Sequence, residues 1–205
     1  MFVVFIYEYK KIKMLSWSYM TKEISSAILR ILPFVIIISV VTILKKKGKL
    51  SAEDTALQQP ISMFSYLFCV IGFVFFSLLI EVVLNSFGLL EVAKWNHTLV
   101  SSIIRIMGAV VLAPIAEELI FRGILLSKLN RKFNKHLAIF LQAVFFVVLH
   151  NFTYQNTTSS NIGIVQTFVD ASLFGYARFY TRSIYTSMTM HISGNLIATL
   201  ERFIL

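Results

Sequence analysis

The chain has 205 residues, of which 57% are hydrophobic and only 14% are charged, and its mean hydropathy is +0.77. Soluble domains are about 45–50% apolar and about 25% charged, so this composition excludes a soluble globular protein. The formal net charge of +9 is accounted for by the basic loops of a membrane protein, and without a nucleic-acid-binding motif we expect no nucleic-acid partner.

Apolar runs of about 20 residues, the length needed to cross a bilayer, recur along the chain. They predict an all-α polytopic membrane protein with about six transmembrane helices. The expected spans are 25–44, 61–80, 98–129, 136–152, 162–180 and 183–204. Residues 1–24 form a segment of uncertain structure, 25–97 hold two helices with their loops, and 98–205 form a helical core.

Loop charges indicate the topology. Residues 81–96 are expected to be a loop or a surface helix, and together with the uncharged loop 153–161 they alternate with three basic loops. The basic loops are 45–49, 128–135 and 178–182. Cytoplasmic loops carry the excess of Lys and Arg, so the C-terminus is predicted to lie outside. The lysines of the N-terminal segment depart from this rule.

The third span carries three charges in six residues, Glu117, Glu118 and Arg122, and contains Pro114, at which a kink is expected. One charge at the bilayer centre costs about 3 kcal/mol on insertion scales, so these charges need partners or a function. Glu118 and Arg122 are four residues apart and share a helix face, which predicts an ion pair. Glu117 lies about 100° around the helix and is free to point elsewhere.

Two later spans carry polar residues at helical spacing. Phe146 and His150 are four residues apart, as are His191 and Asn195. Glu117 precedes the turn near 131–135 by about as many residues as His150 follows it, so an antiparallel pair would bring both to similar depth. The last span could bring His191 and Asn195 to the same cavity.

A carboxylate, two imidazoles and an amide suggest hydrolysis. Glu117 would act as general base on water with help from His150, while His191 and Asn195 would donate hydrogen bonds to the oxyanion. Zinc held by Glu117, His150 and His191 is the alternative, but the His-Glu-x-x-His signature is missing and the metal-free mechanism is favoured.

Other candidates are weaker. A Gly-x-Ser-x-Gly elbow is missing, and Cys69, the single cysteine, lies far from the polar residues in sequence. Asp170 is interpreted as a packing or cavity residue.

The motifs Glu117-Glu118-x-x-x-Arg122, Phe146-x-x-x-His150 and His191-x-x-x-Asn195, in this order over residues 98–205, resemble those of the CPBP family. This family contains the type II CAAX prenyl endopeptidases, the Abi bacteriocin self-immunity proteins and the lysostaphin resistance protein A-like group. The resemblance implies an intramembrane endopeptidase with Glu117, His150, His191 and Asn195 as catalytic residues. Glu118, Arg122 and Phe146 would support them.

The expected substrate is a peptide or membrane protein, such as a CAAX-type protein, a bacteriocin precursor or a signal peptide. The protein is expected to bind it within the lipid bilayer of a plasma membrane. A non-catalytic protein that confers bacteriocin immunity, or that binds a peptide as a scaffold, is the alternative. A proton-coupled transporter using Glu117 and Asp170 is disfavoured, since the sequence shows no repeat symmetry.

Overall fold

The computed structural model describes residues 19–150 and 157–204, and every regular element in these ranges is helical. This confirms the all-α class. The predicted N-terminal segment falls mostly on residues 1–18, which lie outside the described residues, as do 151 and 152 of the predicted fourth span.

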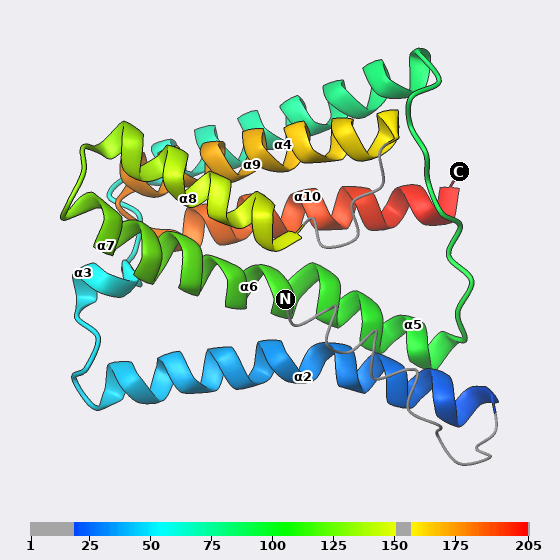
Figure 1. Cartoon of the computed structure of the whole chain (residues 1–205), viewed down its shortest axis with the longest axis horizontal. Helices are drawn as coiled ribbons and strands as arrows, with labels where there is room; N and C mark the ends of the chain where they lie inside the picture. The colour runs from blue at the N-terminus through cyan, green and yellow to red at the C-terminus, as the bar shows by residue number, and fades with distance from the viewer. Residues whose placement is uncertain (1–18, 151–156, 205) are drawn as a thin grey trace.

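Six long helical rods follow the order of the predicted spans within these ranges (Figure 1). The third is a composite rod of consecutive helical segments, from Leu99 to Asn130. The other five are α2 (Tyr19–Lys46), α4 (Met63–Ser86), α8 (Lys135–His150), α9 (Thr158–Thr181) and α10 (Ile184–Ile204). The composite rod consists of α5 (Leu99–Ile106), η1 (Met107–Leu112), α6 (Ala113–Glu118), η2 (Leu119–Leu125) and α7 (Leu126–Asn130).

Three of these rods are long and apolar enough to cross a membrane, namely Thr21–Lys46, Met63–Ser86 and Leu99–Asn130, and α8 is a shorter apolar helix. Helices α9 and α10 have 24 and 21 residues. Polar residues that line an internal cavity, such as Gln166 and Asn195, lower their hydropathy. The protein is therefore a multi-pass membrane protein.

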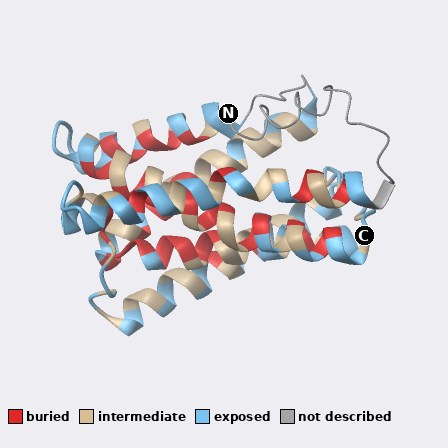
Figure 2. Ribbon diagram, turned by 90° about the horizontal axis from the view of Figure 1, so that it is seen from below, coloured by how far each residue is buried: buried red, intermediate tan, exposed pale blue. Residues whose placement is uncertain are grey.

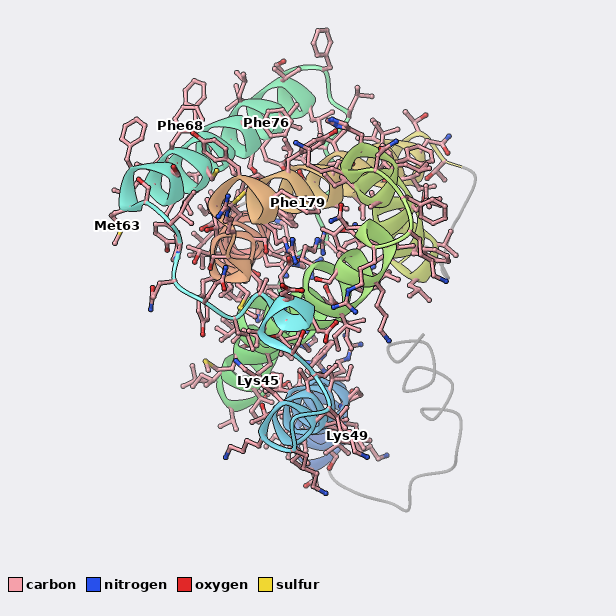
Figure 3. The ribbon with its side chains drawn as sticks, turned by 90° about the vertical axis from the view of Figure 1, so that its left-hand side faces the viewer. Lys45, Lys49, Met63, Phe68, Phe76 and Phe179 are labelled. Atoms are coloured by element: carbon pink, nitrogen blue, oxygen red, sulfur yellow. The ribbon has the colours of Figure 1, made fainter. Side chains whose placement is uncertain are left out.

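The composite rod is the centre of the fold. Figure 1 shows it between α2 on one side and α8, α9 and α10 on the other, with α4 behind α9 and in contact with both α9 and α10. Buried residues concentrate along these inner faces (Figure 2). Viewed end on, α2 and α4 lie on opposite sides of the bundle, and α4 exposes large apolar side chains such as Phe68, as expected of a lipid-facing helix (Figure 3).

Helices approach closely where glycine leaves room. A Cβ atom added to Gly108 in η1 would lie 2.5 Å from a side-chain carbon of Ile31 in α2, and one added to Gly194 in α10 would lie 3.3 Å from the ring of Phe73 in α4. Small residues let helix backbones pack tightly in membranes, so these positions hold α2 and α4 against the inner bundle.

Helix α4 is longer than the predicted second span. Residues 81–86, expected to be part of a loop or a surface helix, instead continue α4 to Ser86. The short helix α3 (Ala52–Thr55) lies between α2 and α4, and Ser51 and Asp54 form a capping box at its start. At Pro114 the composite rod stays helical, with π-helical stretches η1 and η2 on either side of α6. A proline lacks the N–H of the regular helix ladder, and π-helical turns often occur at functional sites.

Candidate active site

Glu118 and Arg122 form the predicted ion pair. The NH1 atom of Arg122 lies 2.7 Å from Oε1 of Glu118, and both side chains are 0% exposed. The other terminal nitrogen of Arg122 donates to the carbonyl oxygen of Ala171 in α9 at 3.2 Å. The pair thus ties the composite rod to α9 and neutralises a charge that would be costly to bury alone.

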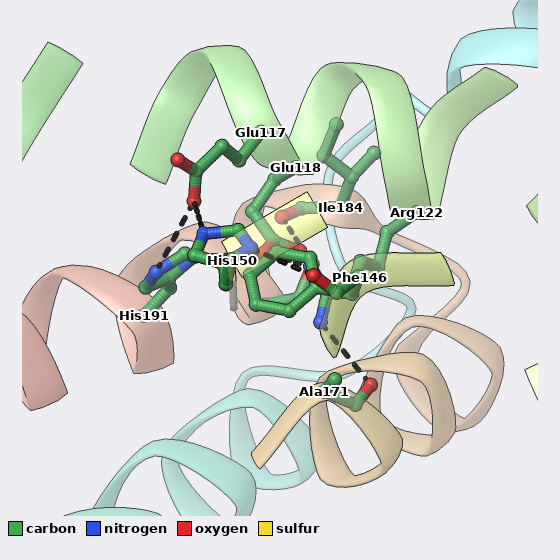
Figure 4. Close-up of polar contacts among 9 residues, drawn as sticks. Glu117, Glu118, Arg122, Phe146, His150, Ala171, Ile184 and His191 are labelled. Atoms are coloured by element: carbon green, nitrogen blue, oxygen red, sulfur yellow. Dashed lines mark hydrogen bonds and ion pairs between the residues drawn. The ribbon is translucent and has the colours of Figure 1, made fainter. Parts of the chain in front are cut away.

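Glu117 points away from this pair and faces two histidines (Figure 4). Its Oε2 atom lies 3.5 Å from Nε2 of His150 and 3.7 Å from Nε2 of His191. These separations are too long for direct hydrogen bonds. A water molecule could bridge them. The structure therefore brings Glu117 and His150 to equal depth, as the hairpin argument predicted, and adds His191 to the same oxygen.

The other ring nitrogen of each histidine has an acceptor. In His150, Nδ1 lies 2.7 Å from the carbonyl oxygen of Phe146, and in His191, Nδ1 lies 2.9 Å from Oε1 of Glu118. A carbonyl oxygen can only accept, as does the carboxylate of Glu118 paired with Arg122, so Nδ1 carries the proton in both rings. The Nε2 atom of each ring then faces Glu117.

Two aromatic rings hold the cationic and imidazole groups in place. The ring of Phe146 stacks on His150 at a centroid distance of 4.1 Å, and the guanidinium of Arg122 lies 4.4 Å from the Phe146 centroid. Phe174 in α9 stacks on His191 at 5.1 Å and also lies 5.1 Å from the Arg122 guanidinium. Arg122 is thereby positioned by cation–π contacts as well as by its ion pair.

Asn195 has a contact that the sequence did not predict. Its Nδ2 atom donates to the carbonyl oxygen of Ala109 in η1 at 2.8 Å. The N–H of Ala113 reaches back five residues to Gly108, and in this pattern the carbonyl of Ala109 would be paired with Pro114, which has no N–H. Asn195 satisfies that carbonyl. Its amide keeps a second N–H, which is the one that could serve an oxyanion.

A cavity of about 610 Å³ joins these groups. Glu117, His150, His191 and Asn195 all line it, together with Asp170 of α9. Asp170 is therefore a cavity residue, one of the two roles expected from the sequence. Phe146 also lines the cavity, whereas Glu118 and Arg122 lie behind its wall.

Residues 99–197 match the family model described as type II CAAX prenyl endopeptidase Rce1-like. This region is therefore similar to the Rce1-like type II CAAX prenyl endopeptidases. The match covers all four proposed catalytic residues and supports the CPBP resemblance of the sequence motifs. No curated protein and no solved structure matches the chain.

The Rce1-like region also allows the zinc alternative to be examined. Two imidazole Nε2 atoms and a carboxylate are donors that zinc accepts, and both histidines have the outer contacts that fix such ligands. Glu117, His150 and His191 would hold the ion, which would polarise the attacking water. Within residues 19–150 and 157–204, however, no group of three or more His, Cys, Asp or Glu side chains is arranged to hold a metal ion.

Phe174 is the contact residue of the Rce1-like site that sequence reasoning missed. It lies four residues after Asp170 on α9, so the two share a helix face. Asp170 and Phe174 lie one helical turn apart, and both line the cavity. The spacing of a polar and an aromatic residue was therefore a sequence signal for Phe174. The backbone carbonyl of Ala171 lies between them and left no such signal.

Proposed function

We propose that this protein is an intramembrane endopeptidase in which Glu117 activates a water molecule for attack on a peptide bond. The observation that carries the proposal is the convergence of Nε2 of His150 and Nε2 of His191 on one oxygen of Glu117, within a cavity of a membrane protein. The match of residues 99–197 to an endopeptidase family model supports the reaction class.

In the proposed reaction, a water molecule lies between Glu117 and the two imidazoles. The Glu117 carboxylate takes a proton from this water as it attacks the carbonyl carbon, a role that contributes about 10²–10⁴-fold to rate. The Nε2 atom of His150 accepts a hydrogen bond from the same water and orients it. The proton on Glu117 then passes to the nitrogen of the leaving amine.

The negative charge that develops on the carbonyl oxygen needs donors. Asn195 supplies its second amide N–H, and its bond to Ala109 holds that group in place. His191 could donate from Nε2 only while it carries a proton on both nitrogens, since Nδ1 is bound to Glu118. Fixed donors of this kind contribute about 3–4 kcal/mol of barrier lowering each.

The substrate class follows the sequence prediction: a peptide or membrane protein, of CAAX type or a bacteriocin or signal-peptide precursor, at the plasma membrane. The test is a comparison of peptide N-termini in membranes and medium from cells that carry wild-type protein or Glu117→Gln at matched abundance. We expect new N-termini only with the wild type. Identical N-terminal profiles would contradict the proposal and favour the immunity or scaffold role.

A further inference from the structure

An apolar groove of about 960 Å³ lies between α4 and α9, two helices that run side by side (Figure 3). Neither the proposed reaction nor the packing around the composite rod uses it. Its two walls are formed by Phe68, Cys69, Gly72 and Phe76 of α4 and by Val169, Leu173, Tyr176 and Tyr180 of α9. Phe68 and Tyr180 are 64% and 55% exposed, so the groove opens toward the lipid. The buried side chains of Phe73 and Met190 close it toward the core.

The length of the groove matches one leaflet of a bilayer. Val169 and Tyr180 are eleven residues apart on α9, which corresponds to about 16 Å along a helix. The hydrocarbon core of a membrane is about 30 Å thick, so one leaflet contributes about 15 Å. Because Leu173 and Tyr176 lie between these two residues at helical spacing, the α9 wall is one continuous stripe. An acyl chain lying along α9 would fill it.

Two cations lie at one end of the groove. Lys135 begins α8 and Arg182 caps the end of α9, within the basic loops 128–135 and 178–182. Both are exposed, and neither side chain forms an ion pair or hydrogen bond with another described residue. The groove is lined by no Asp or Glu of residues 19–150 and 157–204. Exposed cations at a helix end are suited to a lipid headgroup, which lies at the membrane surface.

Tyrosine hydroxyls and a fixed turn complete the polar end. Tyr176 and Tyr180 lie in the last two turns of α9, and the hydroxyl of Tyr176 lies 2.9 Å from Nδ1 of His136 in α8. The carbonyl oxygen of Arg182 accepts a hydrogen bond from Gln58 at 2.8 Å, which holds the turn that carries this arginine. The groove therefore changes along its length from apolar to cationic, as the two ends of an anionic phospholipid require.

We propose that this groove binds one anionic phospholipid, with an acyl chain between α4 and α9 and the phosphate bonded to Lys135 and Arg182. Basic pockets between transmembrane helices bind anionic headgroups in this way, and arginine forms strong charge-assisted hydrogen bonds with phosphate. A lipid with a choline headgroup brings a second, positive charge to the same two side chains and binds less tightly. The site is separate from the proposed catalytic residues and does not depend on cleavage.

Native mass spectrometry of the purified full-length protein in a neutral detergent tests this site. The probes are phosphatidylglycerol and phosphatidylcholine with the same two acyl chains, palmitoyl and oleoyl. Titration gives the dissociation constant of the first bound lipid. We expect phosphatidylglycerol to bind at least about tenfold more tightly than phosphatidylcholine, as charge-assisted hydrogen bonds to the phosphate require.

The headgroup contact is tested by the double variant Lys135→Gln, Arg182→Gln. It should reduce the preference for phosphatidylglycerol to less than about threefold and leave binding of phosphatidylcholine unchanged. The matched control is Lys49→Gln, Lys132→Gln, which removes the same charge from exposed residues of the basic loops that do not line the groove. The control should keep the preference, and melting temperatures show that both double variants are folded.

The acyl-chain contact is tested by Gly72→Leu. A Cβ added to Gly72 meets no atom within 4 Å, so the leucine enters the groove without a clash and competes with the chain. Both lipids should bind at least about fivefold more weakly. Gly163→Leu on α9 is the control, because a Cβ there also meets no atom within 4 Å and the residue does not line the groove.

Equal binding of the two lipids by wild-type protein, or a preference that survives the double substitution at Lys135 and Arg182, would overturn this inference. Displacement of the lipid by glycerol phosphate at the same concentration would also overturn it, because the groove would then contribute nothing. A dimer in the same spectra that Gly72→Leu abolishes would assign the groove to a second copy of the chain and reject the lipid.

Discussion

Nδ1 of His191 lies 2.9 Å from Oε1 of Glu118, and the same oxygen accepts a hydrogen bond from NH1 of Arg122 at 2.7 Å. The sequence predicted that Glu118 neutralises Arg122 and supports the catalytic residues, without naming a contact with His191. Glu118 also orients the imidazole that faces Glu117, in the way that an outer carboxylate fixes a functional histidine. The two adjacent glutamates therefore have different roles: Glu118 bonds to Arg122 and His191, whereas Glu117 faces the cavity.

This difference predicts that Arg122→Ala lowers the amount of folded protein as well as its activity. The substitution removes the cationic partner of a fully buried Glu118 carboxylate, which costs about 3–5 kcal/mol. Membrane immunoblots and thermal melting of purified protein measure the loss. The control is Arg131→Ala, which breaks the exposed pair with Asp54 and should cost less than about 1 kcal/mol. Equal abundance of both variants would contradict the structural role of Arg122.

Phe174 is predicted to position His191. Phe174→Leu keeps an apolar side chain but removes the stack on His191 and the contact with Arg122. A stacking contact between aromatic rings contributes about 0.5–1.5 kcal/mol. We expect kcat to fall about 2- to 10-fold with KM nearly unchanged. Phe179→Leu, on the same helix and against Arg178 instead, is the matched control. If both variants behave alike, Phe174 is a packing residue only.

The crossing of α2 over η1 is predicted to depend on Gly108. Gly108→Ala would place a Cβ 2.5 Å from a side-chain carbon of Ile31, and overpacking of this kind costs about 1–3 kcal/mol. Thermal melting should show the loss. In the Gly108→Ala, Ile31→Ala double variant the clash is removed, so Gly108→Ala should cost less there than in wild-type protein. The same cost in both backgrounds would contradict this packing.

Metal removal distinguishes the two hydrolytic mechanisms. The metal-free mechanism predicts that purified protein keeps its cleavage rate after treatment with a strong chelator and dialysis, because Glu117 itself activates the water. Loss of activity that is restored by added zinc would favour the alternative mechanism, in which Glu117, His150 and His191 hold a zinc ion. Melting temperatures measured before and after chelation are the control, because they show whether the chelator has unfolded the protein.

The rods of the fold were predictable because bilayer thickness fixes the length of apolar runs. Helix-periodic spacing also predicted the pairing of Glu118 with Arg122, and turn counting predicted that Glu117 and His150 would meet. These are local relationships or consequences of a single hairpin, and both can be read from residue numbers.

Contacts between helices distant in sequence were not predictable in this way. The bond from Asn195 to Ala109 depends on which carbonyl the π-helical turn leaves free, and the bond from Arg122 to Ala171 uses a backbone group. The rotation of α10 about its axis decides that His191 reaches both glutamates. No spacing rule fixes such rotations, because they result from packing of the whole bundle.

The central claim is that Glu117 activates the water, and a single-turnover rate measures it most directly. A substrate peptide identified from the N-terminal profiles is cleaved by excess purified wild-type protein or Glu117→Gln protein of equal melting temperature and peptide affinity. The account predicts that Glu117→Gln lowers the rate by about 10²–10⁴-fold. A rate within a few-fold of wild type would contradict it.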